Sequence, residues 1–170
     1  TQKRRRRKRR ELIKDSTPPI ITVPLSVVTE AAGPNGTLVK LPKAIASDDV
    51  DGKVPVFVTM PPGSIFPVGI TTVIFKAKDK AGNSAGASIT VNVQDTRPPV
   101  IKLPSPVAVE AKNPGGAIVR FEATAIDVVD GEVRVVSNPP SGSLFPIGKT
   151  TVVFTAKDRA GNVSSGKVDM

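Results

Sequence analysis

Residues 15 to 24 read Asp15-Ser-Thr-Pro-Pro-Ile-Ile-Thr-Val-Pro24, and residues 95 to 104 repeat this motif as Asp95-Thr-Arg-Pro-Pro-Val-Ile-Lys-Leu-Pro104. Two further motifs return in the same order. Gly63-Ser-Ile-Phe-Pro-Val-Gly69 becomes Gly142-Ser-Leu-Phe-Pro-Ile-Gly148, and Lys78-Asp-Lys-Ala-Gly-Asn83 becomes Lys157-Asp-Arg-Ala-Gly-Asn162. The period of about 80 residues exceeds that of solenoid repeats and is long enough for each copy to bury its own core. The sequence therefore predicts two small domains in tandem.

Within each copy, apolar and polar residues alternate with a period of two, which is typical of half-buried antiparallel strands. Val73, Phe75 and Ala77 fall on one face of such a segment. No segment has a helical period. Turn sequences with glycine, which supplies the positive φ of tight hairpins, separate the alternating segments at Asn35-Gly36, Asp51-Gly52, Gly115-Gly116 and Asp130-Gly131. We therefore expect an all-β chain of two tandem β-sandwiches with Greek-key connections.

The composition excludes several classes of function. The chain has no Cys and no His, which removes disulfides, thiolate metal sites and the usual neutral-pH base. It also has no Tyr and no Trp, so a sugar-binding platform would depend on six Phe, most of them at repeated core or turn positions. We predict a non-enzymatic protein that requires no cofactor and has no small-molecule substrate. No apolar run approaches the roughly 18 residues that span a bilayer, so no transmembrane segment is expected.

The net charge of +9 is concentrated in one segment. Outside it, the chain carries 16 Lys and Arg against 15 Asp and Glu. A basic arm of this kind predicts a polyanion, an acidic protein surface or anionic lipid as its partner. The alternatives are a membrane-flanking sequence, a protease site or a cloning remnant. The arm consists of Lys3, Arg4, Arg5, Arg6, Arg7, Lys8, Arg9 and Arg10.

The Pro-Pro motifs mark the predicted domain boundaries: residues 1–14 form the basic arm, 15–94 the first sandwich and 95–170 the second. Proline fixes φ and extends the residue before it, so the joint between the copies should be short and stiff. Residues 92–94 have no counterpart after Met170. We therefore expect the last strand of the second copy to be clipped, leaving Val168 and Met170 on an edge open to neighbouring repeats or other copies of the chain.

Several linked motifs resemble the hyalin repeat, or HYR, domain. In the first copy they are Asp49-Val-Asp-Gly52, Pro61-Pro-Gly-Ser-Ile-Phe-Pro-Val-Gly69, Thr71-Thr-Val-Ile-Phe75 and Asp79-Lys-Ala-Gly-Asn83, and all but the first aspartate return in the second. The resemblance covers residues 15–170 and implies immunoglobulin-like or fibronectin-III-like sandwiches, found in extracellular and cell-surface proteins and associated with adhesion.

The chain departs from the animal members of that family in its lack of a cysteine pair. The positions of the two cysteines are taken by Val58 and Phe75 in the first copy, and by Ser137 and Phe154 in the second. Packing is expected to replace the disulfide. In this respect the chain is similar to a cysteine-free, prokaryote-like variant of the family.

Acidic and amide side chains gather in the turns of each copy. Convergent carboxylate and amide oxygens are what Ca²⁺ requires, since it takes six to eight oxygen ligands. The alternative interpretation is that Asp and Asn cap turns by hydrogen bonding to their own backbone. Val128 also takes the place of Asp49 in the second copy. The candidate ligands are Asp48, Asp49, Asp51, Asp79, Asn83, Asp127, Asp130, Asp158 and Asn162.

These patterns favour a structural and adhesive module of an extracellular or cell-surface protein, which acts as a stiff spacer and assembles through strand or end-to-end contacts. An alternative hypothesis is a virion or other assembly protein that its basic arm anchors to nucleic acid or an acidic scaffold.

Overall fold

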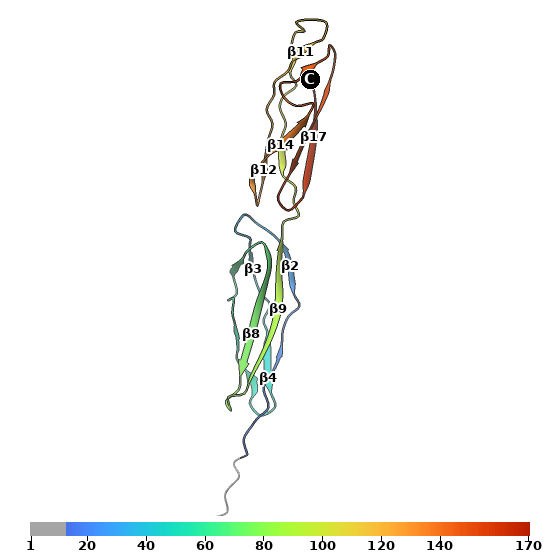
Figure 1. The fold of residues 1–170 in the computed structure, drawn as a ribbon. Helices are drawn as coiled ribbons and strands as arrows, with labels where there is room; N and C mark the ends of the chain where they lie inside the picture. Colours follow the sequence, from blue (N-terminus) through green and yellow to red (C-terminus); the bar gives the residue numbers. More distant parts are fainter. Residues whose placement is uncertain (1–12) are drawn as a thin grey trace, which may run out of the picture. The chain divides into compact units, whose positions relative to one another are not determined.

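The computed structural model describes residues 13–170, and within that range it contains β-strands and no helix (Figure 1). Strands before residue 95 pair only with one another, and so do strands after it. The chain is thus built of two separate β-sandwiches, which confirms the all-β tandem architecture predicted from the repeats. Residues 13–170 include no helix long and apolar enough to cross a membrane.

The first sandwich consists of two main sheets and a short ribbon. One sheet has the strand order β1-β4-β5, the other has the order β2-β9-β8-β6, and β3 pairs with β7. The pairings of β1 with β4, β4 with β5, β3 with β7 and β6 with β8 are antiparallel, and β2 pairs with β9 in parallel. The strands are β1 (Ile20–Thr22), β2 (Val27–Glu30), β3 (Thr37–Val39), β4 (Ile45–Asp48), β5 (Gly52–Val54), β6 (Val56–Val58), β7 (Ser64–Phe66), β8 (Gly69–Lys78) and β9 (Ser84–Gln94).

The second sandwich repeats this plan with one strand fewer. Its sheets have the orders β10-β12-β13 and β14-β16-β17, and β11 pairs with β15. Residues 107–110, which correspond to β2, are not a strand here. The strands are β10 (Val100–Lys102), β11 (Ala117–Ile118), β12 (Thr124–Asp127), β13 (Gly131–Val133), β14 (Val135–Asn138), β15 (Leu144–Phe145), β16 (Thr151–Lys157) and β17 (Val163–Asp169).

The alternating pattern of β8 and β9 places their apolar residues in the core of the first sandwich. Val73, Phe75 and Ala77 of β8 are buried, while the residues between them are exposed. Ile89, Val91 and Val93 of β9 are buried in the same way. In the second sandwich, Val152, Phe154 and Ala156 of β16 are also buried. Removing a side chain of this size from water contributes about 1.5–3 kcal/mol, so these alternating rows are a main source of stability.

The two positions of the missing cysteine pair are direct neighbours in the sheet. Val58 of β6 is the partner of Phe75 in β8, and Ser137 of β14 is the partner of Phe154 in β16. Phe75 and Phe154 are both buried. In the second sandwich, Phe121 packs edge-on against Phe154 with ring centroids 5.5 Å apart. In the second sandwich, aromatic packing therefore lies beside the place that a disulfide holds in the family pattern.

Candidate metal centre

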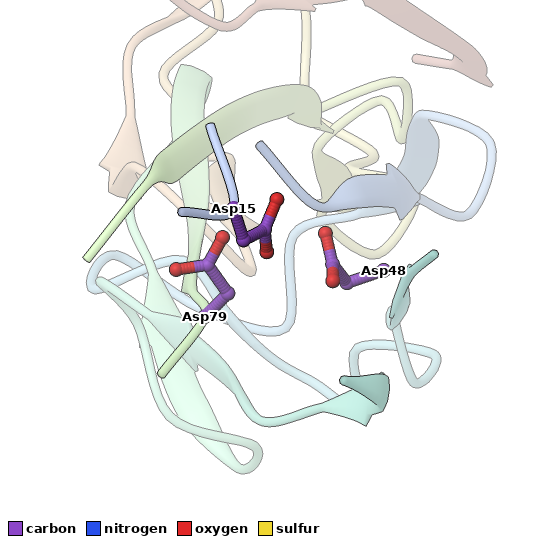
Figure 2. Close-up of side chains that lie close together, drawn as sticks. All are labelled: Asp15, Asp48 and Asp79. Carbon is purple, nitrogen blue, oxygen red and sulfur yellow. The ribbon is translucent and has the colours of Figure 1, made fainter. Parts of the chain in front are cut away.

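Three segments bring three carboxylates together at one end of the first sandwich (Figure 2). Asp15 lies before β1, Asp48 is the last residue of β4, and Asp79 follows β8 directly. One carboxylate oxygen of each residue lies within 4.8 Å of one oxygen of each of the others. We call this set acidic cluster 1. Figure 2 shows the three side chains close together on separate stretches of chain.

Asp48 is held by the turn that joins β4 to β5. Its Oδ1 accepts hydrogen bonds from the backbone N–H groups of Val50 and Asp51, both at 2.9 Å. This is the local capping that favours Asp at the start of a turn. The second carboxylate oxygen, Oδ2, has no hydrogen-bond partner among the described residues and is buried. Only 8% of Asp48 is exposed.

Asp79 and Asn83 hold the turn between β8 and β9, and they also fix the segment that carries Asp15. Oδ1 of Asp79 accepts hydrogen bonds from the backbone N–H groups of Gly82 and Asn83 at 2.7 and 2.8 Å. The side-chain amide of Asn83 donates to Oδ2 of Asp79 at 2.7 Å, and also to the backbone oxygens of Thr17 and Asp15 at 3.2 and 3.4 Å. Asn83 is therefore a positioning residue that links two parts of the cluster.

The second sandwich reproduces the arrangement with Asp95, Asp127 and Asp158, again within 4.8 Å of one another. We call this set acidic cluster 2. Oδ1 of Asp127 accepts hydrogen bonds from Val129 N and Asp130 N at 2.7 and 2.9 Å. The side chain of Asn162 donates to Oδ2 of Asp158 at 2.8 Å and to the backbone oxygen of Asp95 at 3.2 Å. Two copies that differ in many surface residues thus keep the same carboxylate arrangement.

The carboxylates of acidic cluster 2 differ in their electrostatic surroundings. Burial, followed by the neighbouring charge of Asp127, raises the pKa of Asp95 above its ordinary value. Burial also acts to raise the pKa of Asp158, but hydrogen bonds from Asn162 outweigh it and lower the pKa overall. The pKa values of the two carboxylates are therefore shifted in opposite directions.

Two of the predicted ligands have other partners. Asp51 accepts a hydrogen bond from the backbone N–H of Lys80 at 2.7 Å and forms an ion pair with its side chain at 3.2 Å. The backbone hydrogen bond from Lys80 is the main reason why the pKa of Asp51 is lowered. Asp130 makes the same contacts with Arg159. The structure thus places both residues beside the clusters, in bonds that join two turns.

The structure places some of the remaining predicted ligands in the clusters and others outside them. Asp48, Asp79, Asp127 and Asp158 lie in the clusters, and the two Asn residues support them from the adjoining turns. Asp49 is exposed and belongs to neither cluster. Sequence reasoning missed Asp15 and Asp95. The available signal was that both open the repeated Asp-x-x-Pro-Pro motif, where an acidic residue is kept while its neighbours change.

The predicted assembly edge lies at the end of β17. Val168 is buried opposite Val152, and Met170 exchanges two backbone hydrogen bonds with Thr150 at 2.8 and 2.9 Å. A groove of about 470 Å³ lies beside it. Its apolar lining includes Val107, Val109, Val119, Phe145 and Met170.

The basic arm, Lys3 to Arg10, lies outside the described residues. Its predicted partners, and the alternative of a virion or assembly protein that depends on it, stay predictions from the sequence.

The fold and the site define a class of protein. Each half is a small sandwich whose polar constellation consists of carboxylates and turn amides, and the tandem is a repeat module of the adhesion type that is not enzymatic. The chain belongs to the HYR domain family, whose model matches residues 14–93 and again residues 94–170.

Curated relatives agree with this assignment. The chain is 40% identical over 164 residues to hyalin of Strongylocentrotus purpuratus, a match that covers 91% of the chain and 14% of the relative. It is 37% identical to hyalin of Lytechinus variegatus, over 91% of the chain and 31% of the relative. It is 31% identical to the rat "Sushi, von Willebrand factor type A, EGF and pentraxin domain-containing protein 1", over 88% of the chain and 4% of the relative. The chain spans less than a third of each.

Solved structures give a more distant match. Mouse cadherin-23 repeats EC22–24 align with 89% of the chain and 65% of their own at 15% identity, with a TM-score of 0.41. This likeness is too distant to bear on function.

Proposed function

We propose that the chain is a spacer and adhesive segment of an extracellular or cell-surface protein, in which HYR modules follow one another and carry contacts to neighbouring copies or repeats. The observation that carries the proposal is that two family modules occur in direct succession, each with its own sheets and its own buried core. Neither module needs the other to complete a sheet, which suits a chain of repeated units.

The connection between the modules supports a spacer role. Five residues, Asp95 to Pro99, separate β9 from β10. They end in Pro98-Pro99, and Pro99 is fully buried. A short connection with two prolines has few accessible backbone conformations. We therefore expect the connection to restrict the motion of one module against the other.

Small-angle scattering of the full chain tests this expectation, with a matched variant in which Pro98 and Pro99 are both replaced by Ser. The wild-type chain should give a narrow distribution of dimensions, and the variant should give a broader one. If both chains sample the same broad distribution, the connection is not stiff and the spacer proposal fails.

The groove of the second module supports the adhesive part of the proposal. In the first module, β2 pairs in parallel with the end of β9, and Val27 is the partner of Val91. The corresponding residues of the second module are Val107 and Met170, and both line the groove. We propose that the groove accepts an extended segment of a neighbouring HYR module, with the Val-x-Val alternation that residues 91–93 show.

Appending the residues Asn-Val-Gln-Asp after Met170, copied from positions 92–95, tests the groove. The added segment should pair with residues 107–110, raise the melting temperature of the second module and shift the amide resonances of the groove. An appended Asn-Gly-Gly-Asp serves as the matched control. Equal behaviour of the two extended chains contradicts strand addition. Sedimentation then shows whether the parent chain associates with its own copies, which filling the groove should reduce.

A further inference from the structure

We propose that acidic cluster 1 binds a divalent cation of the Ca²⁺ type and that acidic cluster 2 forms the equivalent second site. The inference deepens the proposed function by naming a ligand that would stabilise each module, and it rests on that function only for the extracellular setting in which Ca²⁺ is abundant.

Two carboxylate oxygens of acidic cluster 1 have no hydrogen-bond partner among residues 13–170. Asp48 is more than nine-tenths buried, and its Oδ2 has no hydrogen-bond partner among residues 13–170. Oδ2 of Asp15 is buried and without a partner as well. A buried carboxylate oxygen without a donor is costly, because it has lost its water and gained nothing. Both carboxylates belong to the close group in Figure 2, whose oxygens lie within 4.8 Å of one another, so a cation bound between them would satisfy them.

The negative charge of the clusters is not neutralised by ion pairs among the described residues. Within residues 13–170, the ion pairs involve Asp51, Asp130 and Asp169, and none involves a clustered carboxylate. Three like charges within 4.8 Å repel one another strongly in a partly buried site. A divalent cation removes this repulsion.

Backbone hydrogen bonds orient the three carboxylates of acidic cluster 1. In Asp15, Asp48 and Asp79, a backbone N–H group donates to Oδ1, and the side-chain amide of Asn83 also donates to Oδ2 of Asp79. The carboxylates are thus held in position before any ligand arrives, which lowers the cost of assembling a site. A cation bound there would join the segment before β1 to the turns after β4 and β8.

The ligand chemistry selects Ca²⁺ among common cations. All candidate ligands are oxygens, and the chain has no Cys or His for Zn²⁺. Mg²⁺ demands a near-ideal octahedron and keeps most of its water, whereas Ca²⁺ accepts irregular sets of six to eight oxygens. Three carboxylates from three separate segments suit the less demanding ion, with water completing its coordination.

Calorimetric titration of the full chain with CaCl₂, after treatment with chelator, tests the proposal. Two bound ions per chain are expected, one for each cluster. Asp48→Asn and Asp127→Asn should each remove one ion, and the double variant should remove both. Asn keeps the Oδ1 acceptor for the turn, so both variants should fold. Saturating Ca²⁺ should raise the melting temperature of the wild-type chain by roughly 5–10 °C.

Asp49→Asn is the matched control, because it removes the same charge one residue away from the cluster. It should leave both sites intact. In chelator, Asp48→Asn should melt at a higher temperature than the wild type, since the repulsion is reduced. A role confined to turn capping predicts no change in either condition. The same titration with MgCl₂ should give weaker binding.

Three results overturn the proposal: no saturable binding at millimolar Ca²⁺, an unchanged melting temperature between Ca²⁺ and chelator, or equal loss of binding in Asp49→Asn and Asp48→Asn. These measurements do not involve association between chains. Calcium binding without adhesion or spacing would leave this inference standing and remove the proposed function, and the opposite pair of results would do the reverse.

Discussion

The two sandwiches keep the same acidic clusters but fill the neighbourhood of the lost disulfide differently. In the second, Phe121 packs edge-on against both Phe154 and Phe145, with centroids 5.5 and 6.3 Å apart. In the first, Leu41 occupies the position of Phe121, so an aliphatic side chain replaces the ring that joins the aromatic group. Grooves of about 140 and 190 Å³ border Phe75 and Phe154 in the first and second sandwich. The repeated fold therefore tolerates different packing at this place, while the carboxylate geometry is retained.

Truncation of the two equivalent phenylalanines should have the largest effect and should separate the modules. Phe154→Ala removes one of the two rings that pack against Phe121 and should lower the free energy of unfolding of the second module by about 4 kcal/mol. Phe75→Ala should cost the first module about 3 kcal/mol, because Leu41 stands where Phe121 supplies an aromatic partner in the second module. Urea titration followed by amide NMR reports on each module separately.

Phe57→Ala is the control, because Phe57 is 67% exposed on the outer face of β6 and should cost little. Equal losses for Phe75→Ala and Phe154→Ala would contradict the view that the second module depends more strongly on its aromatic packing.

Substitution of the equivalent glycines Gly36 and Gly116 should destabilise the two modules by similar amounts. Gly36 and Gly116 have φ values of +94° and +107°, and in both a Cβ would lie 1.8 Å from a backbone oxygen, that of Phe66 or Phe145. Gly36→Ala and Gly116→Ala should each cost about 3 kcal/mol, since strain and a clash with fixed backbone add.

Gly52→Ala provides the comparison, because Gly52 has a φ of +69° but no atom within 4 Å of the added Cβ. It should cost about 1 kcal/mol, which is the strain alone. The same urea titration measures all three variants. A large cost at only one of the two equivalent glycines would show that the shared turn is not equally important in both modules.

The fold was predictable because its determinants are local and occur twice. The period-two alternation of β8, the Asn-Gly and Asp-Gly turns and the Pro-Pro motifs each specify a strand, a turn or a boundary region, and the duplication removes most chance matches. The family pattern indicated that Val58 and Phe75 take the places of two cysteines. None of these features required knowledge of contacts between distant segments.

The acidic clusters were predictable only in part. Asp48 and Asp79 stand in turns that the sequence marks clearly, but Asp15 comes from a segment 33 residues before Asp48 and joins them only through the fold. Asp51 and Asp48 lie in the same turn, yet one contacts Lys80 and the other the cluster. Sequence spacing identifies which residues share a turn; it does not determine which of them point to a common centre.

The equivalent strands β9 and β17 should differ slightly in how their side chains contribute to stability. Asp169 of β17 accepts hydrogen bonds from Thr151 Oγ1 at 2.6 Å and from Lys149 Nζ at 2.7 Å, whereas its counterpart in β9 is Thr90, which bonds Ser26. The hydrogen bond from Lys149, followed by that from Thr151, lowers the pKa of Asp169 below its usual value of 3.8. The folded state therefore binds this proton less readily than the unfolded state does.

It follows that the stabilisation by Asp169 is fully present above about pH 4 and is lost as the pH falls through the lowered pKa. Asp169→Asn should lower the melting temperature of the second module by about 1–2 °C at pH 7, because both side chains of the ion pair are largely exposed. The difference from the wild type should shrink below pH 4, while Glu132→Gln, which removes an exposed charge from β13, should show no such trend. A difference between Asp169→Asn and the wild type that persists unchanged at pH 2.5 would mean that the hydroxyl contact, and not the charge, holds this end of the strand.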